Sequence, residues 1–330
     1  MNDEFCVSLF VPEDAPGISR FYREMYGDNF PMRYVYDPAE IVRRYDGVNH
    51  RTAVVHDTNG ELAAVGSLFR SAPNPLLYEA GQLMVTREHR GKGLASLLRR
   101  VVLEEYPTQI PVDALFLEAL CSHTISQHNV SSGFAPTGVE LEWLPAITSP
   151  GHPGRDEGAH NRISLLTLFR VFKDTPQVIH PHPAHTGYIG QCVRSLGLER
   201  TVGPGALPDV ETTACETDIL PDASIATLSV FRIGKDWPEA LARFEAGAMG
   251  YALHVRVNLG DAAAPWAMDI LRGQGFFLSA YLPLWFGTDG MLCQKLPSAP
   301  DFSAPRYGSD AARQLAEAIR ADYEAVAAKV

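Results

Sequence analysis

A mixed, mostly antiparallel sheet flanked by helices is the architecture that the sequence predicts, in the α/β (α+β) class. Residues 51–56 and 61–70 are β-compatible runs joined by a turn containing Asn59-Gly60, and Asn-Gly is the strongest short signal of an antiparallel hairpin. Residues 78–106 predict a strand, a glycine-containing loop and an amphipathic helix in succession. Hairpin pairing and strand–helix alternation together indicate a mixed sheet with helices.

The chain is expected to begin with a strand and two helices. Residues 5–11 predict a short strand that ends before a proline. Residues 14–26 predict a helix that Asp14 caps and Gly27 ends. Residues 38–45 predict a second short helix with proline in its first turn. The hairpin follows, and residues 78–85 are expected to complete a three-stranded antiparallel meander.

A long amphipathic helix is predicted from Leu94 to Tyr106. Its apolar residues recur at the spacing of one buried face, and Pro107 ends it. Residues 112–120 are almost wholly apolar and predict a strand covered on both faces. The remaining elements expected in the first half are a helix at 122–132 ended by Gly133, a strand from Phe134, a mobile loop at 145–160 and a strand at 162–172.

The loop before that long helix has the composition of a phosphate site. The first N–H groups of a helix have no internal partner and lie at the positive end of its dipole, so an anion placed there is stabilised. Glycines let the main chain come close to such an anion. The loop contains two glycines and three cations, which are Arg87, Arg90, Gly91, Lys92 and Gly93. A tight strand-to-helix turn without a ligand is the alternative reading.

Two other phosphate-binding patterns do not fit this loop. The nucleoside-triphosphatase pattern needs Ser or Thr after Gly-Lys to hold magnesium, but Gly93 follows Lys92. The dinucleotide pattern needs a third glycine at position 96, where serine stands, and an acidic residue at the end of a second parallel strand about twenty residues later. Neither requirement is met.

Residues 90–95, Arg-Gly-Lys-Gly-Leu-Ala, match the acetyl-coenzyme A loop of the GNAT acetyltransferase superfamily. Glu79 stands eleven residues before Arg90, and Gly133-Phe134 closes a later helix as the family's Gly-Phe pair usually does. The chain therefore resembles a GNAT enzyme over roughly residues 5 to 173. The resemblance implies a GNAT fold, transferase activity of the N-acetyltransferase type, and acetyl-CoA (coenzyme A) as cosubstrate without a metal.

The resemblance also implies a set of coenzyme contacts. Main-chain N–H groups of residues 83–85 would meet the oxyanion and pair with the pantetheine arm. The implied contacts are Leu83, Met84, Val85, Arg90, Gly91, Lys92, Gly93, Leu94, Ala95 and Ser126. In GNAT enzymes the region of the first two helices lies over the acceptor pocket. Tyr22, Tyr26, Tyr34 and Tyr36 are therefore candidates to line it, with plain packing as the alternative.

Acyl transfer to an amine requires a base for the amine proton, stabilisation of the oxyanion and, for some leaving groups, an acid. Glu79 is the first candidate base, because many GNAT enzymes place a glutamate at this spacing, and a cleft would raise its pKa by desolvation. A cross-strand ion pair is the alternative role. Glu118, within an apolar strand, is the second candidate. Asn129 stands where the family usually has a tyrosine that acts as general acid. His123, Ser126 and His128 are nearby candidates to serve as the acid in its place.

The second half is expected to contain a degenerate copy of the first. A tandem GNAT is predicted, with a GNAT acyl-CoA-binding catalytic domain at 1–175 and a GNAT-like second domain with a C-terminal helix at 176–330; an unrelated α/β cap is the alternative. No second Arg-x-x-Gly-x-Gly/Ala loop occurs between Lys173 and Tyr251. The elements predicted after the linker at 173–183 are helices at 183–198, 238–249, 263–272 and 309–329 and strands at 224–233, 251–259 and from Gly275-Phe276 to Trp285.

Composition limits the partners. A formal charge of −11 and a pI near 5.5 argue against nucleic acid or an acidic membrane. Five scattered cysteines without a C-x-x-C pair indicate neither disulfides nor a zinc site, and the N-terminus does not resemble a signal peptide, so a cytoplasmic location is expected. Three roles are open to the second half: to shape the substrate cleft, to form a homodimer or to cover apolar surface.

Three functions compete at this point. The first is acetyl transfer from acetyl-CoA to a primary amine of a small molecule or peptide. The second is a noncatalytic acyl-CoA-binding sensor, which the residue at position 129 and the lost second loop would suit. The third keeps the fold but uses a hydroxyl acceptor or a longer acyl group.

Overall fold

The structure, a computed structural model, describes residues 4–128, 130, 133–145 and 162–329. The described chain packs into two compact units: residues 4–117 and 130 form the first, and residues 118–128, 133–145 and 162–329 form the second. These units differ from the predicted domains in the placement of two strands, β6 (Ala135–Pro145) and β7 (Arg162–Val171). Both strands belong to the second unit, where β6 pairs with β7 and with β13 (Phe277–Leu282). A catalytic domain ending near residue 175 stays a prediction.

The first unit is built on a sheet in the order β1-β2-β3-β4-β5. Its strands are β1 (Phe5–Leu9), β2 (His50–Asp57), β3 (Leu62–Phe69), β4 (Leu77–Val85) and β5 (Ala114–Leu120), whose last residues enter the second unit. Neighbours are antiparallel except β4 and β5, which are parallel. The predicted hairpin is confirmed: Gly60 has φ 80° and its N–H donates to the Asp57 carbonyl at 3.0 Å.

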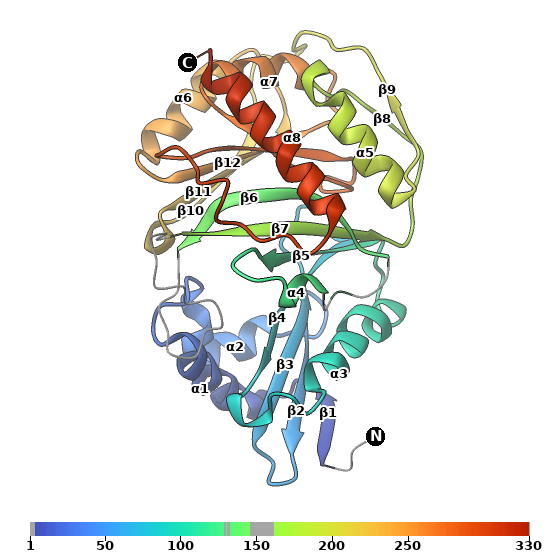
Figure 1. Cartoon of the computed structure of the whole chain (residues 1–330), viewed down its shortest axis with the longest axis vertical. Helices are drawn as coiled ribbons and strands as arrows, with labels where there is room; N and C mark the ends of the chain where they lie inside the picture. The colour runs from blue at the N-terminus through green and yellow to red at the C-terminus, as the bar shows by residue number, and fades with distance from the viewer. Residues whose placement is uncertain (1–3, 129, 131–132, 146–161, 330) are drawn as a thin grey trace. The chain divides into compact units, whose positions relative to one another are not determined.

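Three helices cover the two faces of this sheet (Figure 1). They are α1 (Ala15–Tyr26), α2 (Pro38–Arg44) and α3 (Leu94–Arg100). Val65 of β3 belongs to the core that α1 and α2 cover, whereas a Cβ built at the next residue, Gly66, would meet Leu98 and Val102 of the α3 segment. Because successive residues of a strand face opposite sides, α1 and α2 lie on one face and α3 on the other.

The predicted end of α1 is confirmed, whereas the predicted cap of α1 and the predicted length of α3 are wrong. Gly27 ends α1 with φ 60°. The Asp14 side chain does not cap α1, because its Oδ2 instead accepts a hydrogen bond from the Val11 N–H at 2.9 Å. The helix predicted from Leu94 to Tyr106 is α-helical only to Arg100. A π-helical turn follows at Val101–Glu105 and a 3-10 turn at Tyr106–Thr108.

The second unit contains a sheet in the order β7-β6-β13-β14-β12-β11-β10. The strands not yet given are β10 (Ala214–Leu220), β11 (Ile225–Arg232), β12 (Ala252–Asn258) and β14 (Gly290–Lys295). Strand β10 is antiparallel to β11, β11 is parallel to β12, and β13 is antiparallel to β14. The same pairings join β3 to β4, β4 to β5 and β6 to β7. The chain thus repeats one connectivity, as a tandem arrangement requires.

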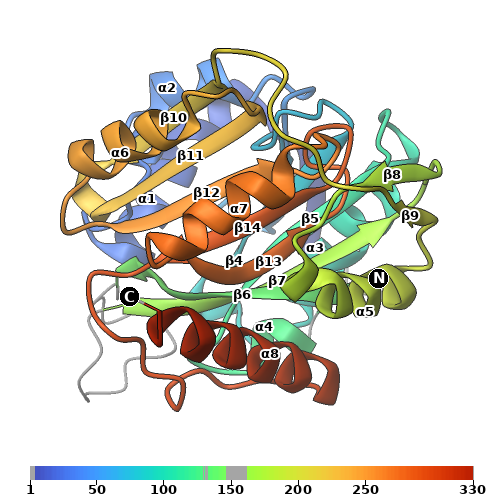
Figure 2. The ribbon, with the colours of Figure 1, turned by 90° about the horizontal axis from the view of Figure 1, so that it is seen from above.

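Four long helices belong to this unit: α5 (Thr186–Leu196), α6 (Trp237–Gly247), α7 (Ala264–Gly273) and α8 (Asp310–Ala327). Figure 2 shows α6 beside α7, and Trp237 Nε1 donates to the Ala267 carbonyl at 3.2 Å. The predicted cap of α8 is confirmed, since Ser309 Oγ accepts from the Ala312 N–H at 3.2 Å. Helix α8 packs against β6 and β13.

Several predictions for this unit need correction. The helix expected at 122–132 is the single turn α4 (Ile125–His128), and residues 129 and 131–132 lie outside the described residues. Two short parallel strands, β8 (Gln177–Ile179) and β9 (Arg200–Val202), were not predicted. Strands β10 and β14 were also missed. The loop predicted at 145–160 lies outside the described residues apart from Pro145. Among the described helices, none is long and apolar enough to cross a bilayer.

The close approach of β6 to β13 generates a stability prediction. A Cβ at Gly138 would overlap Ala280 and the Ser279 carbonyl, so we expect Gly138→Ala to destabilise the protein by about 2–3 kcal/mol. Thermal unfolding followed by circular dichroism measures this. Gly187→Ala in α5 is the matched control, because its Cβ would meet nothing within 4 Å and stability should be unchanged or slightly higher. Equal melting temperatures for both variants would contradict the packing argument.

Candidate active site

The loop between β4 and α3 has the geometry that the sequence predicts for an anion site. After one tight turn at Arg87–His89, Gly91 and Gly93 adopt φ 79° and 85°, and α3 begins at Leu94. A Cβ at either glycine would meet nothing within 4 Å. Glycine is therefore required by the left-handed backbone and not by crowding. The loop has open space around it.

Contacts on both sides hold this loop in place. The His89 ring packs edge-on against Phe5 with centroids 5.4 Å apart, and its Nδ1 lies 2.8 Å from Thr86 Oγ1. The ammonium of Lys92 sits 5.6 Å from the Phe5 ring centroid, and Arg90 Nη2 contacts the Met25 sulfur at 3.7 Å. Leu94 is buried at the start of α3 and anchors the helix to the sheet.

Strand β4 is irregular immediately before the loop. Gln82 has φ 57°, and the register with β3 shifts between Val65 and Ser67, which forms a bulge. The parallel pairing of β4 with β5 runs from Leu77 to Glu79 among the described residues. Residues 83–85 follow Gln82 in this strand, and Leu83 is exposed, Met84 buried and Val85 half-buried.

The sequence model of the acetyltransferase (GNAT) family matches residues 16–134. Residues 16–134 form a GNAT acetyltransferase domain. No curated protein matches the chain. The GNAT domain occupies the part of the chain that holds the loop, β4 and the two N-terminal helices.

Several solved structures of acetyltransferases resemble part of the chain. A GCN5-related N-acetyltransferase from Kribbella flavida has 20% identity and a TM-score of 0.39, and covers 52% of this chain and 100% of its own. A GNAT-family acetyltransferase from Streptococcus pneumoniae has 15% identity and a TM-score of 0.41, covering 51% and 100%. A spermidine N-acetyltransferase chimera from Vibrio cholerae has 16% identity and a TM-score of 0.38, covering 51% and 96%.

Within the GNAT domain, Glu79 lies half-buried on β4, close to the end of its pairing with β5. Its Oε2 accepts a hydrogen bond from Ser71 Oγ at 2.7 Å. Its charge also acts on the Tyr34 phenol, whose pKa it raises together with burial, the larger cause. Glu79 therefore shares its surroundings with one of the four tyrosines predicted to line the acceptor pocket.

Gln82 is the centre of a polar network that sequence reasoning missed. Its Oε1 accepts from the hydroxyls of Tyr45 and Ser67, each at 3.0 Å, and lies 3.2 Å from His50 Nε2. Its Nε2 donates to the Tyr34 hydroxyl at 3.0 Å. Polar residues inside otherwise apolar strands, such as Ser67 and Gln82, are the signal that could have indicated it.

His50 is neutral in this network. Burial lowers its pKa to about 4, which the hydrogen bond with Gln82 only partly opposes. A neutral ring has one N–H, so Nε2 can donate to Gln82 Oε1 in one tautomer. The ring is stacked on Tyr45, with centroids 3.9 Å apart.

Glu118, the second candidate base, belongs to the second unit and has a carboxyl partner there. Its side chain is hydrogen-bonded to Glu140 of β6, and Thr167 Oγ1 donates to Glu140 Oε1 at 2.9 Å. Burial raises the pKa of both carboxyls, which Arg256 opposes, and Glu118 raises that of Glu140 further. Two carboxyls joined by a hydrogen bond share a proton between them, and burial favours the protonated form of each.

His254 closes this buried cluster. Its ring is fully buried, stacks on Trp143 with centroids 3.4 Å apart, and places Nδ1 3.6 Å from Glu140 Oε2. Burial, Arg256 and Arg162 lower the pKa of His254 well below its ordinary value. Burial thus favours the uncharged forms of the two carboxyls and of His254, which lowers the cost of placing these groups in the interior of the unit.

The other predicted residues near β5 lie on the turn that contains α4. His123 is half-buried, and burial together with Arg306 lowers its pKa. His123 Nδ1 and Ser126 Oγ are buried atoms without a hydrogen-bond partner among the described residues. Asn129 lies outside those residues. The catalytic and coenzyme roles assigned to His123 and Ser126 stay predictions, as does the role of His128.

In the second unit, the turn between β11 and α6 is occupied by the segment that precedes β10. Between β11 and α6, the N–H groups of Lys235 and Asp236 donate to the carbonyls of Val210 and Glu211 at 3.0 and 3.2 Å. A Cβ at Gly234 would overlap the main chain of Thr212 and Thr213. The preceding segment thus takes the hydrogen bonds and the space that a phosphate would need at this turn.

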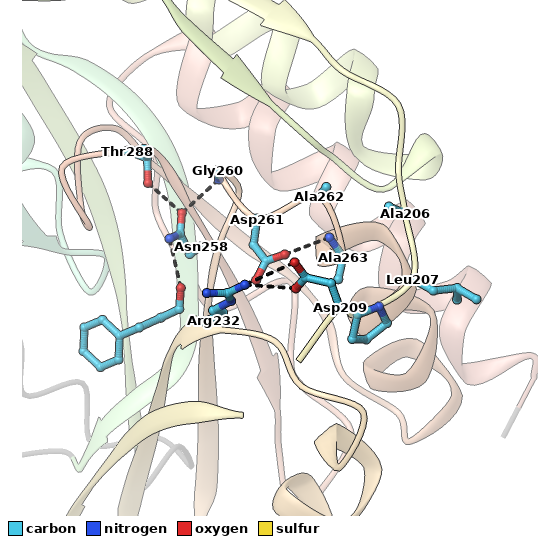
Figure 3. Close-up of a pocket in the computed structure, with 12 residues that line it drawn as sticks. Ala206, Leu207, Asp209, Arg232, Asn258, Gly260, Asp261, Ala262, Ala263 and Thr288 are labelled. Atoms are coloured by element: carbon cyan, nitrogen blue, oxygen red, sulfur yellow. Dashed lines mark hydrogen bonds and ion pairs between the residues drawn. The ribbon is translucent and has the colours of Figure 1, made fainter. Parts of the chain in front are cut away.

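A cavity of about 440 Å³ lies in the second unit at the carboxyl ends of the parallel strands β11 and β12 (Figure 3). Its polar side chains bond to one another and to the main chain. Asp261 accepts from the Ala263 and Ile233 N–H groups, and Asn258 Oδ1 accepts from Gly260 N and Thr288 Oγ1. Arg232 pairs with Asp209. No cluster of three metal-ligating side chains occurs among the described residues.

The shared proton of Glu118 and Glu140 generates a pH prediction. A carboxyl with a raised pKa in the folded state costs stability as pH rises above its ordinary value of 4.5. Glu140→Gln removes that ionisation and keeps a hydrogen-bond donor and acceptor. We expect its melting temperature to match the wild type near that value and to exceed it by about 4 °C or more at about pH 8.

Differential scanning calorimetry across this pH range measures the gap. Glu317→Gln, at an exposed position of α8, is the control and should track the wild type at every pH. A gap between Glu140→Gln and wild type that stays constant with pH would show that the pair holds no shared proton.

Proposed function

We propose that this protein transfers an acetyl group from acetyl-CoA to a primary amine of a small molecule or peptide. The observation that carries the proposal is the loop at 87–93, where two left-handed glycines with open space around them and three cations precede a helix in a GNAT acetyltransferase domain. A diphosphate group suits such a loop because it needs close main-chain approach and positive charge.

The chain offers a base near the loop. Glu79 lies on the same strand, half-buried, and Ser71 holds one of its oxygens. We propose that Glu79 takes the amine proton, directly or through water. Main-chain N–H groups of residues 83–85, which follow the bulge at Gln82, would stabilise the oxyanion. Arg90, Lys92 and the N-terminal residues Leu94 and Ala95 of α3 would hold the coenzyme.

The acceptor would enter over α1 and α2. One hydrophobic core there includes Tyr22, and Tyr26 and Tyr34 pack against it. These tyrosines can therefore serve in packing or in contact with the acceptor. Tyr22 is almost fully buried and acts in packing, whereas Tyr34 and Tyr36 are half-buried and can meet a ligand. The aromatic surroundings suit an amine carried on a small molecule or a peptide side chain.

Coenzyme binding tests the loop. We expect Gly93→Ala to weaken coenzyme A binding about tenfold or more, because alanine at positive φ costs about 1–2 kcal/mol. Gly60→Ala is the matched control in the same unit: this glycine has φ 80° and equally open surroundings, but lies in the β2–β3 turn. Isothermal titration calorimetry gives both dissociation constants. If both variants bind like wild type, the loop does not hold the coenzyme.

The Glu79→Gln variant tests whether Glu79 is the general base. It also distinguishes an acetyltransferase from a noncatalytic acyl-CoA-binding sensor. We expect kcat to fall by about 10²-fold or more while coenzyme affinity stays within about twofold of wild type. Glu61→Gln, at an exposed ion pair with Arg20, should keep wild-type kcat. A wild type that binds coenzyme A but acetylates no amine in a broad panel would favour the noncatalytic sensor.

A further inference from the structure

One side chain anchors the loop at 87–93 to the rest of its unit. The side chain of His89 is 12% exposed, whereas every other residue from 87 to 93 is classed as exposed. A Cβ at either loop glycine, Gly91 or Gly93, would have no neighbour within 4 Å. Because glycine has the largest backbone freedom to lose, such a loop keeps one shape only if a nearby residue holds it. His89 is placed to do so.

The His89 side chain meets three different elements. Its Nδ1 lies 2.8 Å from the hydroxyl of Thr86, the residue that follows β4. Its Nε2 lies 3.8 Å from Asp57 Oδ2 in β2, and its ring packs edge-on against Phe5 in β1. Phe5 and Asp57 are partners in the β1–β2 ladder. The imidazole therefore joins the loop to the first two strands of the sheet.

Hydrogen-bond chemistry fixes which ring nitrogen faces which partner. Asp57 Oδ1 accepts from the N–H groups of Asn59 and Glu61 at 2.8 and 3.0 Å, and the Glu61 N–H is the main cause that lowers the pKa of Asp57. An ionised carboxylate only accepts, so His89 Nε2 carries the N–H that faces it. In the neutral ring, Nδ1 then accepts from the Thr86 hydroxyl. The two partners thus set both the tautomer and the orientation of the ring.

The backbone of His89 extends this anchor into the loop. Its N–H donates to the Thr86 carbonyl at 3.1 Å, and its carbonyl accepts from the Lys92 N–H at 3.4 Å. The Lys92 ammonium lies 5.6 Å from the centroid of the Phe5 ring, the same ring that His89 contacts. Lys92 separates the two loop glycines in the sequence. The anchor therefore reaches the centre of the loop.

We propose that His89 is the positioning residue of the coenzyme loop: Asp57 and Thr86 hold its ring, and the ring holds the loop in the shape that receives a diphosphate. The inference rests on the proposed use of acetyl-CoA. Protein groups engage both ring nitrogens, so the ring is not itself a ligand of the coenzyme in this role. Without this ring the glycines and cations remain, but the free energy of ordering the loop then opposes binding.

Coenzyme affinity is the first test. Isothermal titration calorimetry with coenzyme A is expected to show about tenfold weaker binding for His89→Ala, because the loop must be ordered on binding. His56→Ala is the matched control and should bind like wild type. His56 lies in the same unit and its Nε2 is also near an aspartate, 3.1 Å from Asp14 Oδ1, but this partner precedes α1.

A donor without a diphosphate distinguishes positioning from general damage. For His89→Ala we expect kcat/KM with acetyl-CoA to fall about tenfold through KM, with kcat within about twofold of wild type. S-acetylpantetheine has the thioester arm but no diphosphate, so its kcat/KM should change by less than about twofold. Steady-state rates with one amine acceptor give both values.

Two further substitutions test the partners of the ring. Asp57→Asn keeps an oxygen for the hairpin turn but removes the charge. We expect it to weaken coenzyme A binding about threefold in wild type and less than about 1.5-fold in the His89→Ala background. Thr86→Val removes the hydroxyl and keeps the shape of the side chain. It should also weaken binding about threefold, and it provides a second variant if His89→Ala does not fold.

Amide hydrogen exchange of the unliganded protein tests the anchor without coenzyme or turnover. Mass spectrometry should show about tenfold faster exchange of residues 86–93 in His89→Ala, since local opening becomes easier. Residues 62–69, in β3, should exchange as in wild type. Faster exchange of both segments would indicate global destabilisation and overturn a local anchoring role.

The outcomes separate this inference from the function on which it rests. If wild type binds coenzyme A and His89→Ala binds it equally well, only the role of His89 is overturned. Equal losses with acetyl-CoA and S-acetylpantetheine, or unchanged exchange at 86–93, overturn it as well. Equal losses from Asp57→Asn in both backgrounds show that Asp57 does not act through His89. If wild type binds no coenzyme A, the proposed function fails and this inference with it.

Discussion

The turn out of β4 is the constraint on which the candidate site depends. Gly91 and Gly93 occupy left-handed conformations that a residue with a Cβ adopts only at a cost, and nothing in the described structure crowds them. This turn places three cations, Arg87, Arg90 and Lys92, within a few residues of the start of α3. Burial of Leu94 and Leu98 fixes the helix to the sheet, so the turn is held from below by the core of the GNAT domain.

Two stretches of the chain, β3 to β7 and β10 to β14, share one strand connectivity but differ in the turn that follows their central strand. Both contain an antiparallel pair, a parallel crossover through a helix and a second antiparallel pair. In the first, the turn after the central strand is open; in the second, Val210 to Thr213 occupy it and take its N–H groups. A fold alone does not determine a function, because the ligand meets the loop and not the sheet.

Two clusters of polar side chains within the sheets differ in their burial and in their surroundings. In the cluster of Glu118, Glu140 and His254, the two carboxyls are hydrogen-bonded to each other and burial favours the uncharged form of each group, as a structural role in a low-dielectric interior requires. The network of Gln82 and Tyr34 is only half-buried and lies beside a bulge and a carboxylate.

Short-range constraints are what the sequence by itself determined. The Asn59-Gly60 hairpin, the helices at residues 15–26 and 310–327, and the glycine turn at 91–93 follow from local dihedral preferences and from the period of apolar residues. The tertiary structure alone decided the rest. It shortened the helix at 122–132, paired Glu118 with a glutamate on another strand, and turned Gln82 through a bulge toward Tyr34. The exposed strand β10 lacks an apolar face that a pattern could show. These features depend on contacts between residues distant along the chain, which no local pattern records.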